Sequence, residues 1–556
     1  MPELVMYRNG AIYSVADPFA TAMLVDGASV AWIGQEAAAD ALVDATMEVV
    51  DLAGALVAPA FVDSHVHLTE TGVALACLDL SGCTSLAGLL AAVRSRAQEE
   101  PGPIVGAGWD ESLWPEGRVP TADELEAAAP GREVYLTRVD VHSGLVNSTL
   151  ALNAGIEGVD GWEGGPVAVR EAHARVRDHV LAFDAEARTT YQRRALRHLA
   201  ANGYAAVAEM AAPHIGTRED VVALEALLEA EGDDLPAVRI YWAEPVASAE
   251  AARDLLAGFN SSRMAGLGGD LNVDGSLGSR TAYLREPYSD APAGQGTLYL
   301  DAETIAAHVQ ACTEAGIQAA FHVIGDAGMD QAIAGFRAAA DRLGVSAIQR
   351  GRHRIEHAEL LDEAAIATLL DLGVTVSMQP LFDAMWGGPG GQYEQRLGAD
   401  RSAAMNEVGR LLGAGVPVCL GSDSPVTPTS PWATVKACLE HHTQTSRVSA
   451  RAAFVAHTRA GYRAAGDPDP LAGQLVPGAE ATFAIWAASE LSVQTPDARV
   501  SSWSTDARAG TPMLPVLEDE LPTCLQTVRR GRTIFTSAPL DAGTSGSGAV
   551  VGSVTD

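Results

Sequence analysis

Residues 61–67 read FVDSHVH, an apolar run that ends in two histidines, His65 and His67. On a β-strand, residues i and i+2 point to the same side. Two imidazoles on one face at a strand end can bind one metal ion, because neutral imidazole is a standard zinc ligand. The same pair also occurs in solvated turns, so the pattern needs support from the rest of the chain.

Strand-like runs alternate with Ala- and Leu-rich helical stretches through the middle of the chain. Eight strand–helix units predict an α/β fold, a TIM-like (β/α)8 barrel in which catalytic groups gather at the carboxyl ends of the strands. Residues 68–180 are too many for one connection between a strand and a helix, so we expect a large insertion after strand one. The strand candidates are 58–67, 204–210, 238–244, 268–275, 319–326, 352–360, 375–382 and 416–425.

The two ends of the chain carry a different pattern, in which short β-like runs alternate with turns. Asn9-Gly10 and Asp26-Gly27 predict tight hairpin turns near the N-terminus, and similar runs return at 481–487 and 525–535. We therefore expect one small β-sandwich domain built from both ends. The predicted domains are 1–58 with 470–536 for the sandwich, 59–469 for the barrel, and 537–556 for a flexible Gly/Ser-rich tail.

The composition narrows the class of protein. The chain has 556 residues and a formal net charge of −34, with no basic tract, which disfavours binding to nucleic acid or to an anionic membrane surface. No apolar stretch reaches the roughly 18 residues of a membrane span, and the first ten residues carry no secretory pattern. Six scattered cysteines without a CxxC motif suit reduced thiols. We expect a cytoplasmic protein whose partner is a small-molecule substrate.

Three further polar residues close strand candidates in the same way as the HxH pair. His322 ends the fifth run, His357 the sixth and Asp423 the eighth. A single buried histidine is usually a structural hydrogen-bonding group, and an aspartate in GSDSP suits a helix cap. Together with His65 and His67 they supply five nitrogen or oxygen donors at strand ends, which predicts a catalytic metal site.

The chain resembles the amidohydrolase superfamily, in particular the YtcJ-like branch called amidohydrolase family 3. The resemblance is collinear from about residue 3 to residue 535. It implies the barrel with a composite β-sandwich, metal-centre residues at His65, His67, His322, His357 and Asp423, one or two divalent ions (Zn²⁺ first, Mn²⁺ or Fe²⁺ as alternatives), and a homodimer. The motifs that carry it are AFVDSHVHL (60–68), GAGWDESLWP (106–115), HSGLVNSTLAL (142–152), DGSLGSRTAYL (274–284), FHVIGDA (321–327), HRIEHAEL (353–360), SMQPLFD (377–383) and GSDSPV (421–426).

One departure from the superfamily concerns the bridging ligand. Many members join two metals through a carboxylated lysine at strand four, but Lys436 is the only lysine of this chain and lies beyond strand eight. Asp270 stands where this family usually places that lysine, although its side chain is much shorter. Glu209, at the end of strand two, has the longer reach and is our preferred candidate. A single metal held by the histidines and Asp423 is the third option.

The predicted chemistry is hydrolysis of a C–N amide bond, in an N-acyl or N-formyl amine, by metal-activated water. Asp423 serves as general base and then acid, and His357 helps to polarise the carbonyl. Known relatives include an N-substituted formamide deformylase, which does not determine the substrate. A ring deaminase is an alternative, but such enzymes usually carry a glutamate where Gly325 stands. Carbamate, lactone or ester hydrolysis stays open, and a non-catalytic scaffold is disfavoured by the retained donors.

Two further sets of residues complete the predicted site. Ligating histidines need hydrogen-bond acceptors that orient them, and Asp326, Glu356 and Asp63 are candidates, with a structural role preferred for Asp63. Arg280 follows a glycine-rich loop, so it suits either a substrate carboxylate or a salt bridge within that loop. The predicted pocket-lining residues are Trp109, Asp110, His142, Arg280, Gln379, Asp383 and Trp386.

Overall fold

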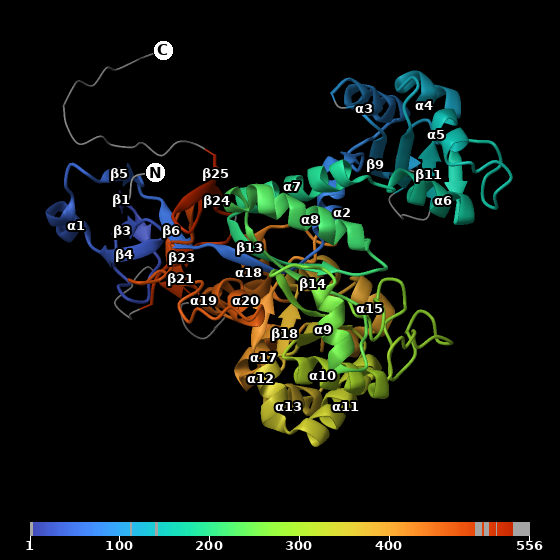
Figure 1. Cartoon of the computed structure of the whole chain (residues 1–556). Coiled ribbons are helices and arrows are strands. Elements are labelled where there is room, and N and C mark those ends of the chain that lie inside the picture. The colour runs from blue at the N-terminus through green and yellow to red at the C-terminus, as the bar shows by residue number, and fades with distance from the viewer. Residues whose placement is uncertain are drawn as a thin grey trace, which may run out of the picture. The chain divides into compact units, whose positions relative to one another are not determined.

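The computed structural model describes residues 4–99, 101–111, 114–138, 143–494, 503–504, 511–518 and 520–537 (Figure 1). Its internal contacts divide the chain into two compact units. The first unit combines Met1–Leu68 with Ala195–Asp556, and the second is Thr69–Arg194. His142 and the predicted tail beyond Ser537 lie outside the described residues.

Eight parallel strands form the barrel of the first unit, in the order β7, β13, β14, β15, β16, β17, β18 and β19. A bridge between Val66 and Ser424 links the first strand to the segment after the last one, so the barrel is nearly closed. The predicted TIM-like barrel is confirmed. The strands are β7 (Phe61–Val66), β13 (Tyr204–Ala211), β14 (Ala237–Trp242), β15 (Met264–Leu267), β16 (Gln318–Val323), β17 (Arg354–His357), β18 (Thr375–Met378) and β19 (Val418–Leu420).

Helices follow most barrel strands, as expected for parallel strands that need crossover connections. The strands between them are buried along their whole length where both faces are covered, as in β13. The helices are α8 (Arg218–Glu231), α9 (Ala249–Ala257), α10 (Ala302–Ala315), α11 (Asp326–Leu343), α12 (Val345–Gly351), α13 (Glu363–Leu372), α14 (Pro380–Trp386), α15 (Gln392–Leu397), α16 (Ala399–Ser402), α17 (Val408–Ala414), α18 (Pro431–Glu440), α19 (Ala450–Ala456) and α20 (Arg459–Ala464).

The fourth strand lies earlier in the sequence than predicted. Strand β15 ends at Leu267, and the run 268–275, expected to form the strand, is the loop after it. Gly268 and Gly269 have φ values of +125° and +83°, which interrupt the extended backbone. The double glycine therefore ends the strand, and Asp270 belongs to the loop.

Strands from both ends of the chain form the small β-domain of the first unit. The N-terminal strand β6 (Leu56–Pro59) pairs with the C-terminal strand β20 (Phe483–Ala487) in one five-stranded sheet. Apolar side chains from both sheets share one core. The sheets contain β4, β3, β1 and β5, and β2, β6, β20, β24 and β25; the bounds are β1 (Leu4–Arg8), β2 (Ala11–Ile12), β3 (Ala22–Asp26), β4 (Ser29–Gly34), β5 (Glu48–Asp51), β24 (Thr523–Arg529) and β25 (Arg532–Thr536).

The two predicted N-terminal turns have different outcomes. Asp26 pairs with Ser29 across a hairpin between β3 and β4, as expected. Asn9-Gly10 does not close a hairpin, because β1 pairs with β3 and β5 while β2 joins the other sheet. Asn9 has a φ of +60°, so the turn there carries the chain from one sheet to the other.

The second unit has a five-stranded sheet of its own, in the order β12, β11, β10, β9 and β8. Helices pack on it around a core that includes Trp109, Trp114 and Leu136. Its elements are β8 (Leu78–Asp79), α3 (Leu86–Glu99), β9 (Ile104–Trp109), α4 (Ala122–Ala128), β10 (Val134–Arg138), β11 (Ser143–Val146), α5 (Ser148–Asn153), β12 (Val167–Val169) and α6 (Arg170–Val180). Among the described residues of the whole chain, no helix has the length and apolar character to cross a bilayer.

Candidate metal centre

The carboxyl ends of four barrel strands bring the five predicted donors to one place. His65 is in β7 and His67 follows that strand, His322 is in β16, His357 ends β17, and Asp423 follows β19. All are buried except His322, whose side chain is 13% exposed. Residues that are far apart in the sequence thus form one cluster, as the barrel topology predicts.

Two carboxylates face the HxH pair. Asp423 Oδ1 lies 3.1 Å from His67 Nε2 and 3.4 Å from His65 Nε2. Asp270 Oδ2 lies 3.2 Å from His67 Nε2, and Asp270 Oδ1 lies 3.4 Å from His65 Nε2. Each imidazole therefore directs Nε2 toward both carboxylates, which is a donor arrangement that suits a divalent cation.

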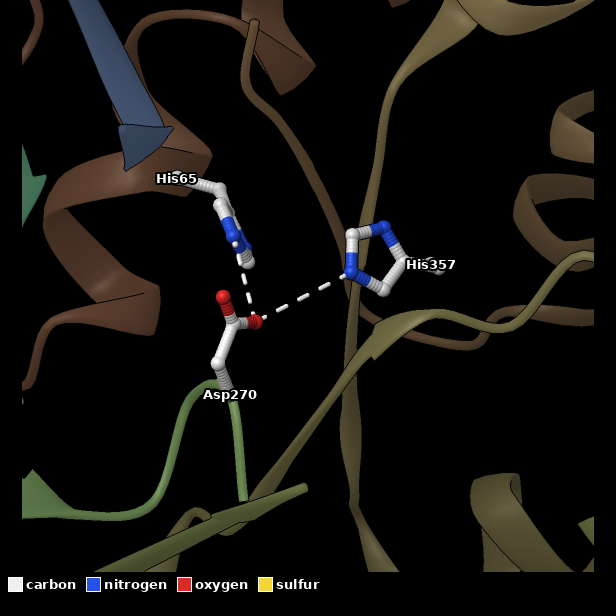
Figure 2. Close-up of side chains that lie close together, drawn as sticks. All are labelled: His65, Asp270 and His357. Atoms are coloured by element: carbon white, nitrogen blue, oxygen red, sulfur yellow. Dashed lines mark ion pairs between the residues drawn. The ribbon is translucent and has the colours of Figure 1, made fainter. Parts of the chain in front are cut away.

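Asp270 also faces His357, as Figure 2 shows, with 4.0 Å between Asp270 Oδ1 and His357 Nε2. Two groups of three side chains have donor atoms within 4.8 Å of one another, and both groups contain His65. The first group is His65, Asp270 and His357, and the second is His65, His67 and Asp423. Because both groups contain His65, whose Nε2 has a single lone pair, they describe two alternative positions for one ion.

The glycines before Asp270 explain how so short a side chain reaches the centre. A Cβ atom on Gly268 would lie 1.8 Å from the carbonyl oxygen of Ala320 in β16. Only glycine allows this approach at a φ of +125°. The loop backbone is consequently held against β16, next to the histidines.

The backbone of Asp423 is held by the first barrel strand. Its N–H donates to the carbonyl of His65 at 2.8 Å, and its φ of +54° is unusual for a residue other than glycine. Asp63 supports the same loop, since it accepts from Ser422 N at 2.9 Å and from Ser422 Oγ at 2.6 Å. Burial opposes ionisation of Asp423, but the charge of His65 keeps the pKa of Asp423 below its usual value.

His357 is oriented by contacts on both sides of its ring. Its backbone has a φ of +69°, and its Nδ1 lies 2.8 Å from Gln379 Oε1. Because that oxygen only accepts, Nδ1 carries the proton and the Nε2 lone pair faces Asp270. The ring stacks on Phe382 with 5.9 Å between the ring centroids. Burial, reinforced by nearby His322, lowers the pKa of His357 to about 4.

A buried ion pair orients His65 from behind. His65 Nδ1 lies 3.0 Å from Glu356 Oε2, which also accepts from Arg354 Nη2 at 2.9 Å. Arg354 Nε donates to Glu356 Oε1 at 2.6 Å, and Arg354 Nη2 reaches the carbonyl of Ser64 at 2.8 Å. Burial opposes the charge on Glu356, but Arg354 and His65 lower its pKa to about 2. The ionised carboxylate fixes the proton on Nδ1 of His65. This leaves the lone pair of Nε2 free to coordinate a metal ion.

Glu209 is directed toward a backbone group. Its Oε2 accepts from the backbone N–H of Leu68 at 2.7 Å. Neither metal-capable group contains it. Its neighbour in the register is Val66 of β7, so the side chain supports the segment that carries the HxH pair.

The other residues predicted to orient the histidines occupy different places. Asp326 starts α11 and accepts from the backbone N–H of Arg285, away from the cluster. Asp63 contacts backbone groups and Ser422, as described above, which is the structural role preferred for it. Glu356 is thus the one candidate of the three with a hydrogen bond to a histidine ring of the cluster.

The predicted pocket-lining residues are scattered. Gln379 contacts His357, and Trp386 packs on Phe382 with 4.9 Å between the ring centroids. Asp383 accepts from the backbone and the ring of His442, both at 3.0 Å. These three belong to α14 and its N-cap, on the side of the cluster that holds His357.

Arg280 forms the salt bridge that was the alternative to substrate binding. Its guanidinium contacts both carboxylate oxygens of Asp290, at 3.1 Å and 2.8 Å.

In the second unit, Trp109 is 1% exposed and donates to the carbonyl of Leu136, so it packs the interior of that unit. Asp110 pairs with Arg138 at 3.0 Å.

Sequence reasoning missed Arg354. The signal was present, because Arg354 and Glu356 alternate with His357 and Ile355 along β17 and so share a face. Their adjacency on one buried face favours an ion pair, since an isolated charge in a core is unstable.

Unpaired buried atoms show that a metal fits these residues. Within the described part of the chain, His65 Nε2, Asp270 Oδ1 and His322 Nδ1 are buried without a hydrogen-bond partner. Buried polar atoms are rarely left without a hydrogen-bond partner, and two carboxylates beside a group of imidazoles form a site for a cation. Imidazole nitrogen and carboxylate oxygen suit Zn²⁺, Mn²⁺ or Fe²⁺.

A barrel with His and Asp donors at its strand ends defines a metal-dependent hydrolase. The chain belongs to the amidohydrolase family, whose family model matches residues 48–535. It is similar to the crystal structure of an uncharacterised metal-dependent hydrolase from Pyrococcus furiosus, with 27% identity, a TM-score of 0.70, and coverage of 87% of this chain and 98% of that one.

Curated relatives agree with the family. The protein LONG AFTER FAR-RED 3 of Arabidopsis thaliana is 28% identical over 86% of this chain and 86% of its own length. The putative amidohydrolase YtcJ of Bacillus subtilis is 28% identical over 69% of this chain and 73% of its own length. An N-substituted formamide deformylase of Arthrobacter pascens is 29% identical over 26% of this chain and 28% of its own length.

Proposed function

We propose that this protein hydrolyses the C–N amide bond of an N-acyl or N-formyl amine. The observation that carries the proposal is the position of the Asp270 carboxylate, which faces His65, His67 and His357 at 3.2 to 4.0 Å. The residues that would hold the metal are His65, His67, Asp270, His357 and Asp423, with His322 beside them.

In this proposal Asp270, rather than Glu209, would be the carboxylate that holds the metal in place of a carboxylated lysine. Its two carboxylate oxygens face different histidines, whereas Glu209 already accepts from Leu68 N–H. The carboxylated lysine of other superfamily members has no counterpart, because Lys436 is in α18 and hydrogen bonds to the carbonyl of Glu518. Asp270 takes over the position with a different chemical group.

When bound, the metal polarises the scissile carbonyl and lowers the pKa of the attacking water. Asp423 accepts the proton that the water loses and returns it to the leaving nitrogen. Its carboxylate is held for this task by the hydrogen bond from its own N–H to β7. Glu356 and Gln379 keep His65 and His357 in the tautomers that leave Nε2 unprotonated.

One observation favours an amide, and a second disfavours ring deamination. A relative acts on an N-substituted formamide, as its name states. Gly325 occupies the place of the glutamate that ring deaminases of the superfamily usually carry, and a Cβ there would lie 2.1 Å from the carbonyl of Tyr283. Lactones, esters and carbamates present a similar carbonyl and are the second candidate class.

The test is a hydrolysis screen with the zinc-loaded full chain. N-formyl amines, N-acyl amines, dipeptides, lactones and a cyclic amidine are compared by amine or acid release, with the Asp423→Asn variant as the control for specific turnover. The proposal expects amine release that depends on metal and is lost in Asp423→Asn. Turnover limited to lactones, or ammonia release from the amidine, contradicts it. The homodimer and the cytoplasmic location stay predictions.

A further inference from the structure

The structure has a cavity at the opposite end of the barrel from the metal centre. Its volume is about 770 Å³, within the range of small-molecule sites. It is lined by Pro59, just before β7, and by Val418, the first residue of β19, so it lies at the amino ends of the strands. Helices α19 and α20, labelled in Figure 1, form another wall and contact β19.

The wall of this base cavity (the cavity bounded by Pro59, Val418, α19 and α20) is largely apolar. Phe454 is fully buried, whereas Val15 and Val455 are 52% and 38% exposed. Apolar side chains that are partly open to solvent at a cavity favour an apolar ligand, because covering them removes apolar surface from water.

Two arginines give the base cavity its charge. Arg451 and Arg459 both line it, and among the described residues neither forms an ion pair. The Nε of Arg459 is buried and has no hydrogen-bond partner in that part of the chain. Arg451 lies beside the Tyr13 hydroxyl, where it opposes the rise that burial causes in the tyrosine pKa.

Two arginines without a nearby carboxylate are unusual in so acidic a chain. The sequence has 71 acidic and 37 basic residues, yet no carboxylate side chain lines the base cavity among the described residues. Burial and the like charge of Arg463 lower the pKa of Arg459. Arg451 is exposed and Arg459 is half-buried, and a guanidinium that lacks a carboxylate partner is stabilised by an anionic acceptor.

We propose that the base cavity binds an organic carboxylate with an apolar body, such as a medium-chain fatty acid, at a site separate from the metal centre. The guanidinium groups of Arg451 and Arg459 bind the carboxylate, and the alkyl chain covers Val455 and Val15. The planar guanidinium matches a carboxylate through paired hydrogen bonds. The inference does not depend on which amide the enzyme hydrolyses.

The test is calorimetric titration of the full chain with sodium decanoate. Wild type is expected to bind it, and an Arg451→Gln/Arg459→Gln variant at least about tenfold more weakly, because charge-assisted hydrogen bonds are lost. Arg463→Gln, an exposed change on the same helix that does not line the cavity, is the matched control and shifts the dissociation constant less than threefold. Val455→Trp, which fills the cavity without changing charge, also abolishes binding.

Further measurements distinguish binding in the base cavity from binding at the metal centre and from an interface between two copies of the chain. A carboxylate can bind a metal ion too, so the titration is repeated after metal removal, and the arginine-dependent binding is expected to persist. Binding that vanishes with the metal, or equal affinity for 1-decanol, overturns the proposal. Tighter binding of decyl phosphate overturns the choice of a carboxylate. A change of sedimentation coefficient in the double arginine variant shows that a second copy covers the cavity, which also overturns it.

Discussion

The Glu356→Gln substitution tests how the buried ion pair supports the metal centre. In the native protein Glu356 Oε2 accepts from both His65 Nδ1 and Arg354 Nη2, and Oε1 accepts from Arg354 Nε. A glutamine has one acceptor oxygen and one donor nitrogen. Its oxygen is best placed at the Oε2 position, where it keeps two hydrogen bonds. The amide nitrogen then meets Arg354 Nε at a site where the native distance is 2.6 Å.

Two effects of different size follow. Arg354 and Glu356 are both fully buried, and removal of one partner of a buried ion pair costs about 3–5 kcal/mol of stability. His65 keeps a neutral acceptor but loses the carboxylate that raises its basicity. Loss of such an outer partner lowers metal affinity by about 10- to 100-fold, equivalent to about 1.4–2.8 kcal/mol.

Both quantities can be measured on one preparation. Urea unfolding of the metal-free protein gives the free energy of unfolding, and competition with a chromophoric chelator gives the zinc affinity. His353→Gln is the matched control, because His353 is a buried polar side chain of the same barrel whose ring contacts the Thr313 hydroxyl at 2.9 Å and the backbone N–H of Ala319 at 2.9 Å. We expect His353→Gln to lose stability but to keep zinc affinity within about threefold, below the range for an outer partner. Unchanged zinc affinity in a folded Glu356→Gln variant refutes the reasoning.

Other substitutions test the carboxylate ligand, the glycine loop and a buried histidine. Asp270→Asn is expected to lower the zinc affinity measured by chelator competition by more than Glu209→Gln does; the reverse order assigns that role to Glu209. Gly268→Ala places a methyl group 1.8 Å from the Ala320 carbonyl at a φ of +125°, so urea unfolding should show a loss of about 1–3 kcal/mol, and an equal midpoint contradicts this. Burial lowers the pKa of His457 from 6.5 to about 3, so the unfolded state binds the extra proton between these values. The stabilising contribution of neutral His457 is complete above pH 6.5 and falls by about 1.4 kcal/mol per pH unit below it. His457→Gln should therefore flatten the pH dependence of the free energy of unfolding. An unchanged slope between that free energy and pH argues against a neutral native His457.

The barrel was predictable because its signal is repeated. Eight apolar runs, most of them followed by a helical stretch, allow few arrangements other than a parallel barrel. The fourth strand was misplaced because 268–275 contains alternating apolar residues, while the two glycines that end the strand have left-handed φ values that a pattern of polarity does not report. Asn9-Gly10 has the composition of a hairpin turn, but which sheet accepts the next strand depends on long-range pairing with β6.

The site was only partly predictable, for a related reason. Histidines at strand ends are visible in the sequence, because the strand ends themselves are visible. The choice between Glu209 and Asp270 rested on side-chain reach, which assumes that both backbones lie at similar distances from the centre. The structure places the Asp270 loop against β16 and directs Glu209 to the Leu68 backbone, so side-chain reach alone does not decide between the two carboxylates.

The path of this loop explains how a chain with one remote lysine can supply a carboxylate at the centre. A carboxylated lysine carries its charge at the end of a long side chain, whereas the carboxylate of Asp270 is two bonds from its Cα. The backbone must therefore come closer. The residues after Asp270 pair with β16, since Val273 N–H donates to the carbonyl of His322 and His322 N–H donates to the carbonyl of Leu271. Together with the close approach of Gly268 to Ala320, these bonds attach the loop to the strand that carries a histidine of the cluster. Backbone geometry thus compensates for side-chain length, which supports the proposal that Asp270 rather than Glu209 would hold the metal in place of the carboxylated lysine.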